Sequence, residues 1–404
     1  MSDRPRERFF DRSTPPHILT LVLLASISAL TMNIFLPSLP GMTEYFQTDY
    51  RVMQLSVAVY LGTSAVLQIV VGPISDKVGR RPVILWGLTG FLLATLGCLL
   101  APTAEIFLLF RMAQAIAAVA MVLSRAVVRD MFPQDQAASM IGYVTMGMSV
   151  VPMLGPVLGG FLDQFFGWKA NFWLLLLAGG ILLWVAWADL GETGTPSGLT
   201  LGRQFREYPE LLVSPRFWGY CLASALSSGS FFAYLGGAPY VGTKLYGLDP
   251  AMLGLYFGAP SVGYFLGNFL SGRYSAQIGV NRMVLWGCTI TFSGIAGSLV
   301  LALAGLDTAA TFFGLMVFVG IGNGMSIPNA TAGMLSVRPH LSGTASGLGG
   351  AIMIGGGAAL SAYAGSLLKP GMGAAPLLWI MQVTAILGLA SILYVIRRQR
   401  QLGL

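Results

Sequence analysis

The chain has 404 residues, of which 10% are Asp, Glu, Lys or Arg and 55% are apolar. Soluble domains carry roughly 25% charged residues, so these charges are too few for the surfaces of the two or three soluble domains expected from this length. The composition indicates an integral membrane protein and excludes a disordered chain, a secreted disulfide scaffold and a typical cytosolic enzyme. A net charge of +7 then indicates basic loops facing an anionic membrane leaflet, and we expect no nucleic acid partner.

Twelve apolar runs are long enough to cross a bilayer as helices, which need about 20 residues each. The basic segment before the first run has no signal-peptide cleavage pattern, and that run is too long for the apolar part of a signal peptide. We therefore predict an all-α integral membrane fold in contact with the lipid bilayer, whose twelve transmembrane helices are 17–39, 52–73, 83–103, 105–129, 138–163, 170–190, 216–240, 251–273, 282–304, 309–334, 343–367 and 374–396.

The basic residues are distributed unevenly between the two sides of these spans. With both termini in the cytoplasm, 18 of the 23 Lys and Arg residues fall on the cytoplasmic side and 4 on the other, which leaves Arg111 inside a span. Cytoplasmic loops of multi-pass membrane proteins carry this excess. We therefore expect both termini to be cytoplasmic.

The loop after the second span, GPISDKVGRRPV (72–83), combines glycines with opposite charges. Gly72 would let neighbouring helices approach closely, and Asp76 is placed to pair with an arginine at a partly desolvated interface. Such a cluster can latch two helices and open when a transporter rocks; the alternative is that the basic residues only fix the topology. The expected residues of this cytoplasmic gate are Gly72, Asp76, Gly79, Arg80, Arg81 and Arg129.

Arg111 lies about six residues inside the fourth span, roughly 9 Å from its end at 1.5 Å per residue. Ionisable side chains inside a membrane are costly and usually functional. We expect Arg111 to face the interior of the protein, oriented by Gln114 one turn further on. The alternative is that its long side chain snorkels to the membrane interface.

The fifth span contains the segment GPVLGG (155–160). Gly155 and Gly159 are four residues apart, which lets two helix backbones pack closely, and Gly160 extends this small surface. Pro156 removes a helix hydrogen bond and is expected to kink the helix. A packing groove with no role in transport is the alternative interpretation.

The stretch 191–215 is the longest polar connector in the chain. It separates two sets of six spans, and an internal repeat supports this division, because 72–90 aligns without gaps to 272–290 with seven identical residues. We predict two pseudo-symmetric six-helix bundles, 1–190 and 216–404, joined by a cytoplasmic linker at 191–215. Duplicated halves around a central site are typical of alternating-access transporters.

The other candidate substrate contacts are aromatic or polar side chains within spans. Phe257, Tyr264 and Asn268 fall on one face of the eighth span, at spacings of seven and four. Tyr60 and Tyr234 lie in the second and seventh spans. An apolar cavity with few hydrogen-bonding groups suits drug-sized molecules; packing or lipid contact is the alternative for each of these aromatic rings.

The sequence shows no pattern for a cofactor or a metal. Its three cysteines lie in apolar runs and are expected to pack as small apolar groups, and its glycine clusters lack the strand and lysine of a nucleotide loop. No nucleophile–base grouping or metal-ligand spacing supports an enzyme. The longest soluble stretch, about 25 residues, is too short for the soluble domain expected of a receptor or scaffold.

Several of these segments resemble one family. GPISDKVGRRPV (72–83) resembles the signature loop of the major facilitator superfamily, and GPVLGG (155–160) is similar to the motif of its antiporters. TMNIFLPSLP (31–40), LFRMAQ (109–114) and RAVVRDMF (125–132) are similar to the Bcr/CflA branch of drug:proton antiporters. The resemblance implies a monomeric multidrug exporter of the bacterial inner membrane, which exchanges a small drug-like molecule for protons near Arg111.

The chain departs from this branch at Asn33, where the branch usually has an aspartate in the first helix. Asparagine cannot titrate, and none of the sixteen acidic residues lies well inside a span. Three explanations are open. The protein is an Asp-to-Asn form with impaired proton coupling, or it couples protons through an acidic residue at the edge of a span, such as Glu105 or Asp163. Otherwise it is a facilitator or metabolite exporter without proton coupling. Because a cation would meet Arg111 without a balancing carboxylate, we predict neutral or weakly acidic amphipathic substrates, with Asn33 and Arg111 at the binding and coupling site.

Overall fold

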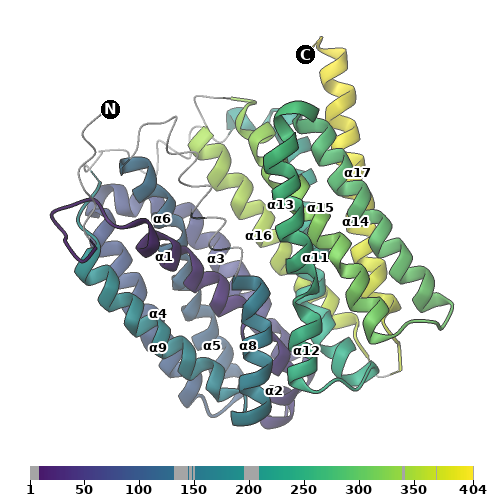
Figure 1. Cartoon of the computed structure of the whole chain (residues 1–404), viewed down its shortest axis with the longest axis horizontal. Helices are drawn as coiled ribbons and strands as arrows, with labels where there is room; N and C mark the ends of the chain where they lie inside the picture. Colours follow the sequence, from purple (N-terminus) through teal and green to yellow (C-terminus); the bar gives the residue numbers. More distant parts are fainter. Residues whose placement is uncertain are drawn as a thin grey trace.

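The computed structural model describes residues 9–131, 144, 148, 151–194, 209–338, 342–369 and 371–403. Within them every regular element is helical (Figure 1). In chain order the elements are α1 (Ile18–Asn33), η1 (Leu36–Ser38), α2 (Leu39–Tyr45), α3 (Tyr50–Val78), α4 (Arg80–Leu100), α5 (Ala104–Gln114), η2 (Ala115–Ala117), α6 (Ala118–Met131), α8 (Val151–Phe166), α9 (Lys169–Asp189), α11 (Pro215–Tyr240), η3 (Val241–Leu245), α12 (Pro250–Phe257), α13 (Ala259–Ile278), α14 (Val280–Leu303), α15 (Ala309–Leu335), α16 (Ser342–Leu367) and α17 (Ala375–Gln401).

These elements account for the twelve predicted crossings. Nine helical stretches of the described chain are long and apolar enough to span a membrane. The other three crossings are α8, α11 and the pair α12–α13. Helix α11 has 26 residues, but its serines at 224, 227, 228 and 230 lower its apolar character. The first half of the predicted span 138–163 lies outside the described residues except for positions 144 and 148.

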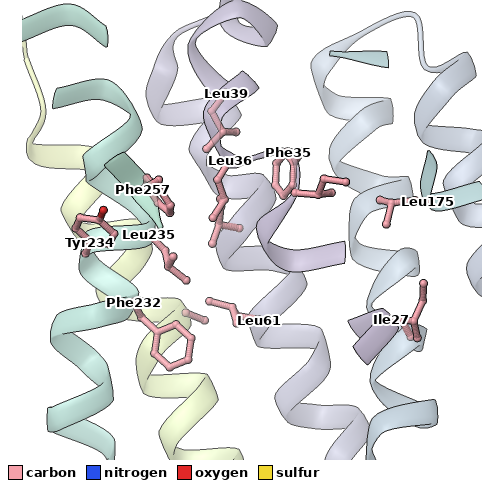
Figure 2. Packing of buried hydrophobic residues seen from close by; sticks show 14 of the residues in the cluster. Ile27, Phe35, Leu36, Leu39, Leu61, Leu175, Phe232, Tyr234, Leu235 and Phe257 are labelled. Carbon is pink, nitrogen blue, oxygen red and sulfur yellow. The ribbon is translucent and has the colours of Figure 1, made fainter. Parts of the chain in front are cut away.

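The helices form two bundles that stand side by side (Figure 1). Helices α1 to α9 make the purple-to-blue bundle and α11 to α17 the green-to-yellow one. The two chain ends lie at the same end of the molecule, which we call the termini face; the loops after α2, α4 and α14 lie at the other end, which we call the opposite face. The main buried apolar cluster contains residues of both bundles, and Figure 2 shows Tyr234 and Phe257 of one bundle beside Leu36, Leu39 and Leu61 of the other.

The bundles are joined by polar contacts close to the opposite face. The Tyr50 hydroxyl donates to the Gly236 carbonyl at 3.0 Å, and Gln54 Nε2 donates to the Ser361 carbonyl at 2.6 Å. Nearby, Lys244 pairs with Glu44 at 3.0 Å. Among the described residues, every hydrogen bond or ion pair found between the bundles lies in this region, so the bundles are latched together at the opposite face.

Three predicted spans are interrupted in the structure. The first breaks after Asn33, because Pro37 cannot donate the next helical hydrogen bond. The fourth contains the 3₁₀ turn η2, and the eighth divides at Gly258, just before Pro260. Each break lets the chain redirect its side chains within the membrane, which a simple apolar run does not reveal.

Candidate functional site

Arg111 is the centre of a buried polar network in the N-terminal bundle. Its side chain has no solvent exposure. The guanidinium donates from Nη1 to Gln114 Oε1 at 2.5 Å and from Nη2 to the Thr31 carbonyl at 2.9 Å. Gln114 in turn donates from Nε2 to Thr95 Oγ1 at 2.8 Å. Arg111 therefore points into the protein, and the alternative that it snorkels to the membrane interface is wrong.

The network holds a cation with neutral groups alone. Thr31 lies in the last turn of α1, where carbonyls lack the amide partner of a continuing helix and the helix dipole favours positive charge. The guanidinium carbon lies 4.2 Å from the centre of the Phe35 ring and 4.5 Å from that of Tyr60, so both rings add cation–π attraction. The ion pairs found in the described chain do not include Arg111.

Tyr60 is fixed by α1. Its hydroxyl lies 3.0 Å from Ser28 Oγ and donates to the Ser28 carbonyl at 3.1 Å. The structure thus brings together three predicted site residues, Tyr60, Arg111 and Gln114. It adds Thr31, Phe35 and Thr95, which the sequence analysis missed; the break at Pro37 was the one available signal, because it frees carbonyls at the end of α1.

Asn33 lies against α8 rather than in a hydrogen bond with Arg111. Its side chain is 1% exposed, and Nδ2 donates to the Ala29 carbonyl at 2.7 Å. A Cβ added at Gly155 would lie 3.6 Å from the Asn33 Cβ, and one at Gly159 would lie 1.6 Å from the Ile34 carbonyl oxygen. Gly159 is therefore required for the contact of α8 with the broken end of α1, whereas a side chain at Gly155 would make an ordinary van der Waals contact.

The same segment of α8 also contacts the other bundle. A Cβ at Gly160 would lie 2.2 Å from the Pro250 carbonyl oxygen, and one at Gly254 would lie 2.3 Å from that of Pro156. Pro156 is inside the helix α8. The close packing expected of these glycines is thus present at Gly159 and Gly160, and it joins α1 and α8 to α12 at the opposite face; the kink expected at Pro156 stays a prediction.

The remaining predicted contacts separate into two groups. Tyr234 is fully buried, with its ring 4.8 Å from that of Phe257 (Figure 2), and its hydroxyl has no hydrogen-bond partner. Tyr264 and Asn268 lie beyond the break at Gly258, where Asn268 Nδ2 donates to the Tyr264 carbonyl at 2.8 Å. A one-residue turn at Gly258, with helical backbone angles, separates Phe257 from Tyr264 and Asn268, and the shared face expected for these three residues stays a prediction.

The predicted gate is a charge cluster at the termini face. Arg80 pairs with Asp76 at 2.5 Å and with Asp130 of α6 at 3.1 Å. Arg81 instead donates from Nε to the Leu190 carbonyl at 2.8 Å, and Glu192 accepts from the backbone amides of Arg80 and Arg81. Asp76 therefore pairs with Arg80, one of the three arginines proposed for it; the side chain of Arg129 lies outside the described residues.

The two glycines of the gate have different surroundings. Gly79 has φ 106°, and a Cβ there would lie 2.5 Å from Glu192 Oε2. A Cβ at Gly72 would meet nothing within 4 Å. The described residues therefore show no close helix approach at Gly72, although α3 contacts α16 of the other bundle as far as Gln68, where a Cβ at Gly350 would lie 3.3 Å from Gln68 Oε1.

The carboxylates of the described chain all lie near helix ends or in loops. Glu105 is exposed in the first turn of α5, and Asp163 is half-buried in the last turn of α8. Asp189, the last residue of α9, is fully buried and accepts from the Phe10 and His17 amides and from Thr20 Oγ1 at 2.6 to 3.0 Å. It anchors the N-terminal segment to α9. In the described residues no group of three or more His, Cys, Asp and Glu side chains could hold a metal.

The sequence profile of the Major Facilitator Superfamily matches residues 21–362. The chain belongs to the major facilitator superfamily. It is 30% identical to a chloramphenicol resistance protein of Pseudomonas aeruginosa, over 80% of this chain and 78% of that protein. It is 26% identical to a bicyclomycin resistance protein homolog of Haemophilus influenzae, over 96% and 98% of the two chains. These relatives confirm the resemblance to the Bcr/CflA branch.

The fold is confirmed by a solved structure. A bacterial homolog of the human lysosomal transporter Spinster, in an inward-facing and occupied conformation, matches with a TM-score of 0.71 and 17% identity, over 95% of this chain and 96% of that one. The predicted architecture of twelve helices in two bundles is therefore correct. The protein is a multi-pass membrane transporter of this superfamily.

Proposed function

We propose that the protein is a secondary-active multidrug exporter that works by alternating access of its two bundles. The relatives named for resistance to chloramphenicol and bicyclomycin support drug export. The position of the cross-bundle contacts supports alternating access, because separating them would open the opposite face. The charge cluster of Arg80, Asp76 and Asp130 then joins α3, α4 and α6 within the N-terminal bundle at the termini face.

The uneven distribution of basic residues supports an orientation with the termini face in the cytoplasm. In that orientation the contacts at the opposite face close the protein toward the periplasm. We place the moving units at 1–190 and 216–404, with 191–215 as their linker; positions 195–208 of this linker lie outside the described residues. A bacterial inner membrane location and a monomer follow from the resemblance.

The observation that carries the substrate prediction is the neutral environment of Arg111. Its hydrogen-bond acceptors are a carbonyl and an amide oxygen, so its positive charge is not cancelled by a carboxylate. A cationic drug would lose hydration and meet a like charge there. Neutral or weakly acidic amphipathic molecules avoid that cost.

Proton exchange is the coupling that we propose, with Asp163 as the first carboxylate to test and Glu105 as the second. Asp163 is half-buried on α8, the helix that contacts both α1 and the other bundle. The second candidate is facilitated transport without protons, which the amide of Asn33 favours because it cannot titrate. The two candidates differ in whether a proton gradient drives transport.

The deciding experiment is chloramphenicol efflux from energised cells that lack their own pumps, with and without a protonophore. Proton exchange predicts that the protonophore abolishes efflux by the unmodified chain and that Asp163→Asn does the same. Efflux that survives the protonophore would support the facilitator. Efflux found only in Asn33→Asp would mean that the site is intact and uncoupled, and a strong preference for quaternary ammonium dyes would contradict the proposed substrate class.

A further inference from the structure

A second arginine on the fourth membrane helix has no hydrogen-bond or ion-pair partner among the residues that the structure describes. Arg125 of α6 is half-buried, and its Nε is sealed from solvent without a hydrogen bond. The ion pairs found in the described chain do not include it. Arg80 and Arg111, by contrast, each have defined acceptors. A partly desolvated guanidinium without an acceptor is costly, so Arg125 is suited to receive an anionic group from outside the protein.

Arg125 and Arg111 lie on the same membrane span at different depths. The two residues are 14 positions apart on the fourth span, which corresponds to about 21 Å along a helix. Arg111 lies nearer the opposite face and Arg125 nearer the termini face. A molecule that enters from the termini face would therefore meet Arg125 before it reached Arg111.

The electrostatic neighbour of Arg125 belongs to the other bundle. Tyr264 of α13 lies close enough to interact with the guanidinium. Its phenol can donate a hydrogen bond to an anion. The pair thus offers a cation from one bundle and a hydroxyl donor from the other, on the side of the interface away from the polar contacts of Tyr50 and Gln54.

We propose that Arg125 and Tyr264 form a carboxylate-binding subsite, where weakly acidic amphipathic substrates dock before they move toward Arg111. Guanidinium groups bind carboxylates through charge-assisted, often bidentate hydrogen bonds. A carboxylate held by groups of both bundles would also be released when the bundles move apart at this level. The proposal of this subsite rests on the proposed export function, and it states where the acidic substrates of that function would bind.

The test compares an acid with a neutral molecule of the same skeleton. Radiolabelled 1-naphthylacetic acid and 1-naphthylacetamide are bound to the full-length protein in nanodiscs at neutral pH, where the acid is ionised. We expect Arg125→Gln to raise the Kd of the acid at least tenfold, which is about 1.4 kcal/mol, and to change the Kd of the amide by less than about twofold. Arg125→Lys should keep most of the acid affinity, and Tyr264→Phe should weaken it about threefold.

Arg216→Gln is the matched control. Arg216 also has a sealed Nε without a hydrogen bond, but its neighbour is Tyr220 of its own helix, so neither ligand should lose affinity. Unchanged amide binding shows that each variant is folded. Equal effects of Arg125→Gln on both ligands, or none, would overturn the subsite. An unmodified chain that binds the amide and not the acid would overturn the subsite alone, whereas one that binds neither would also contradict the proposed export function.

Discussion

The loop between α3 and α4 and the loop between α13 and α14 have the same backbone and different side chains. Gly79 and Gly279 have φ 106° and φ 90°, with ψ 153° and 148°. Each glycine amide donates to a serine carbonyl four residues earlier, Ser75 or Ser275, at 2.9 Å. The repeat detected at 72–90 and 272–290 is therefore a repeat of a structural turn.

The chemistry at the two turns has diverged. In the first, Arg80 joins Asp76 and Asp130, while in the second the equivalent positions are Val280 and Ala276. A cluster of uncharged side chains, which we call the neutral cluster, lies beside the second turn: the Tyr220 hydroxyl donates to Asn281 Oδ1 at 2.7 Å and Gln399 Nε2 donates to the Tyr220 oxygen at 3.1 Å. Its charged neighbour, Arg216, is not in the ion pairs found among the described residues. One bundle thus has an ionic cluster that charge changes can break, and the other has a neutral cluster.

The largest expected effect comes from the glycines themselves. Both have backbone angles that are essentially restricted to glycine, which cost about 1–3 kcal/mol for other residues. Gly79→Ala should destabilise the protein more than Gly279→Ala, because its Cβ would also displace Glu192 from the backbone amides of α4, whereas a Cβ at Gly279 meets open space. Thermal unfolding in detergent would measure this, and equal losses would show that Glu192 moves aside freely.

Removing the ionic cluster should have the next largest effect. Arg80→Gln should cost about 1–2 kcal/mol, since it breaks two partly buried ion pairs. The control is Arg338→Gln, which breaks the exposed pair with Glu210 in the other bundle and should cost less than about 0.5 kcal/mol. Similar unfolding curves for the two variants would mean that Arg80 contributes no more than a surface charge.

The smallest effect concerns the neutral cluster and its response to salt. Asn281→Ala should cost about 1 kcal/mol through lost hydrogen bonds. Raising the salt concentration from 0.1 to 1 M should narrow the stability difference between the unmodified chain and Arg80→Gln, because salt screens charges. The stability difference between the unmodified chain and Asn281→Ala should stay constant as the salt concentration rises. If salt changed the stability differences of Arg80→Gln and Asn281→Ala equally, the contrast between the ionic and the neutral cluster would be wrong.

The lengths of the apolar runs in the sequence predict much of the fold. Ten predicted spans begin and end within about five residues of the helices observed, because burying apolar side chains in lipid requires runs of fixed length. The sequence could not reveal that Gly258 separates Phe257 from Tyr264, since glycine is tolerated inside membrane helices. The spacing of Arg111 and Gln114 did predict their contact, because residues three apart share a helix face.

The spacing of residues in the sequence could not predict contacts between segments that the tertiary structure brings together. The Thr31 carbonyl meets Arg111 only because α1 ends two residues later and packs against α6 and η2. Asp189 looked like an edge carboxylate because it ends an apolar run, yet the N-terminal segment folds back and covers it. Both cases depend on segments that are distant in the sequence.

The most direct test of the account is a competition between a neutral and a cationic ligand for the purified protein. The pair would be a naphthyl alcohol and the trimethylammonium compound with the same ring, each displacing radiolabelled chloramphenicol in nanodiscs. The uncompensated charge of Arg111 predicts that the alcohol displaces it at a concentration at least tenfold lower, and that Arg111→Gln removes this preference. Tighter binding of the cation to the unmodified protein would contradict the account.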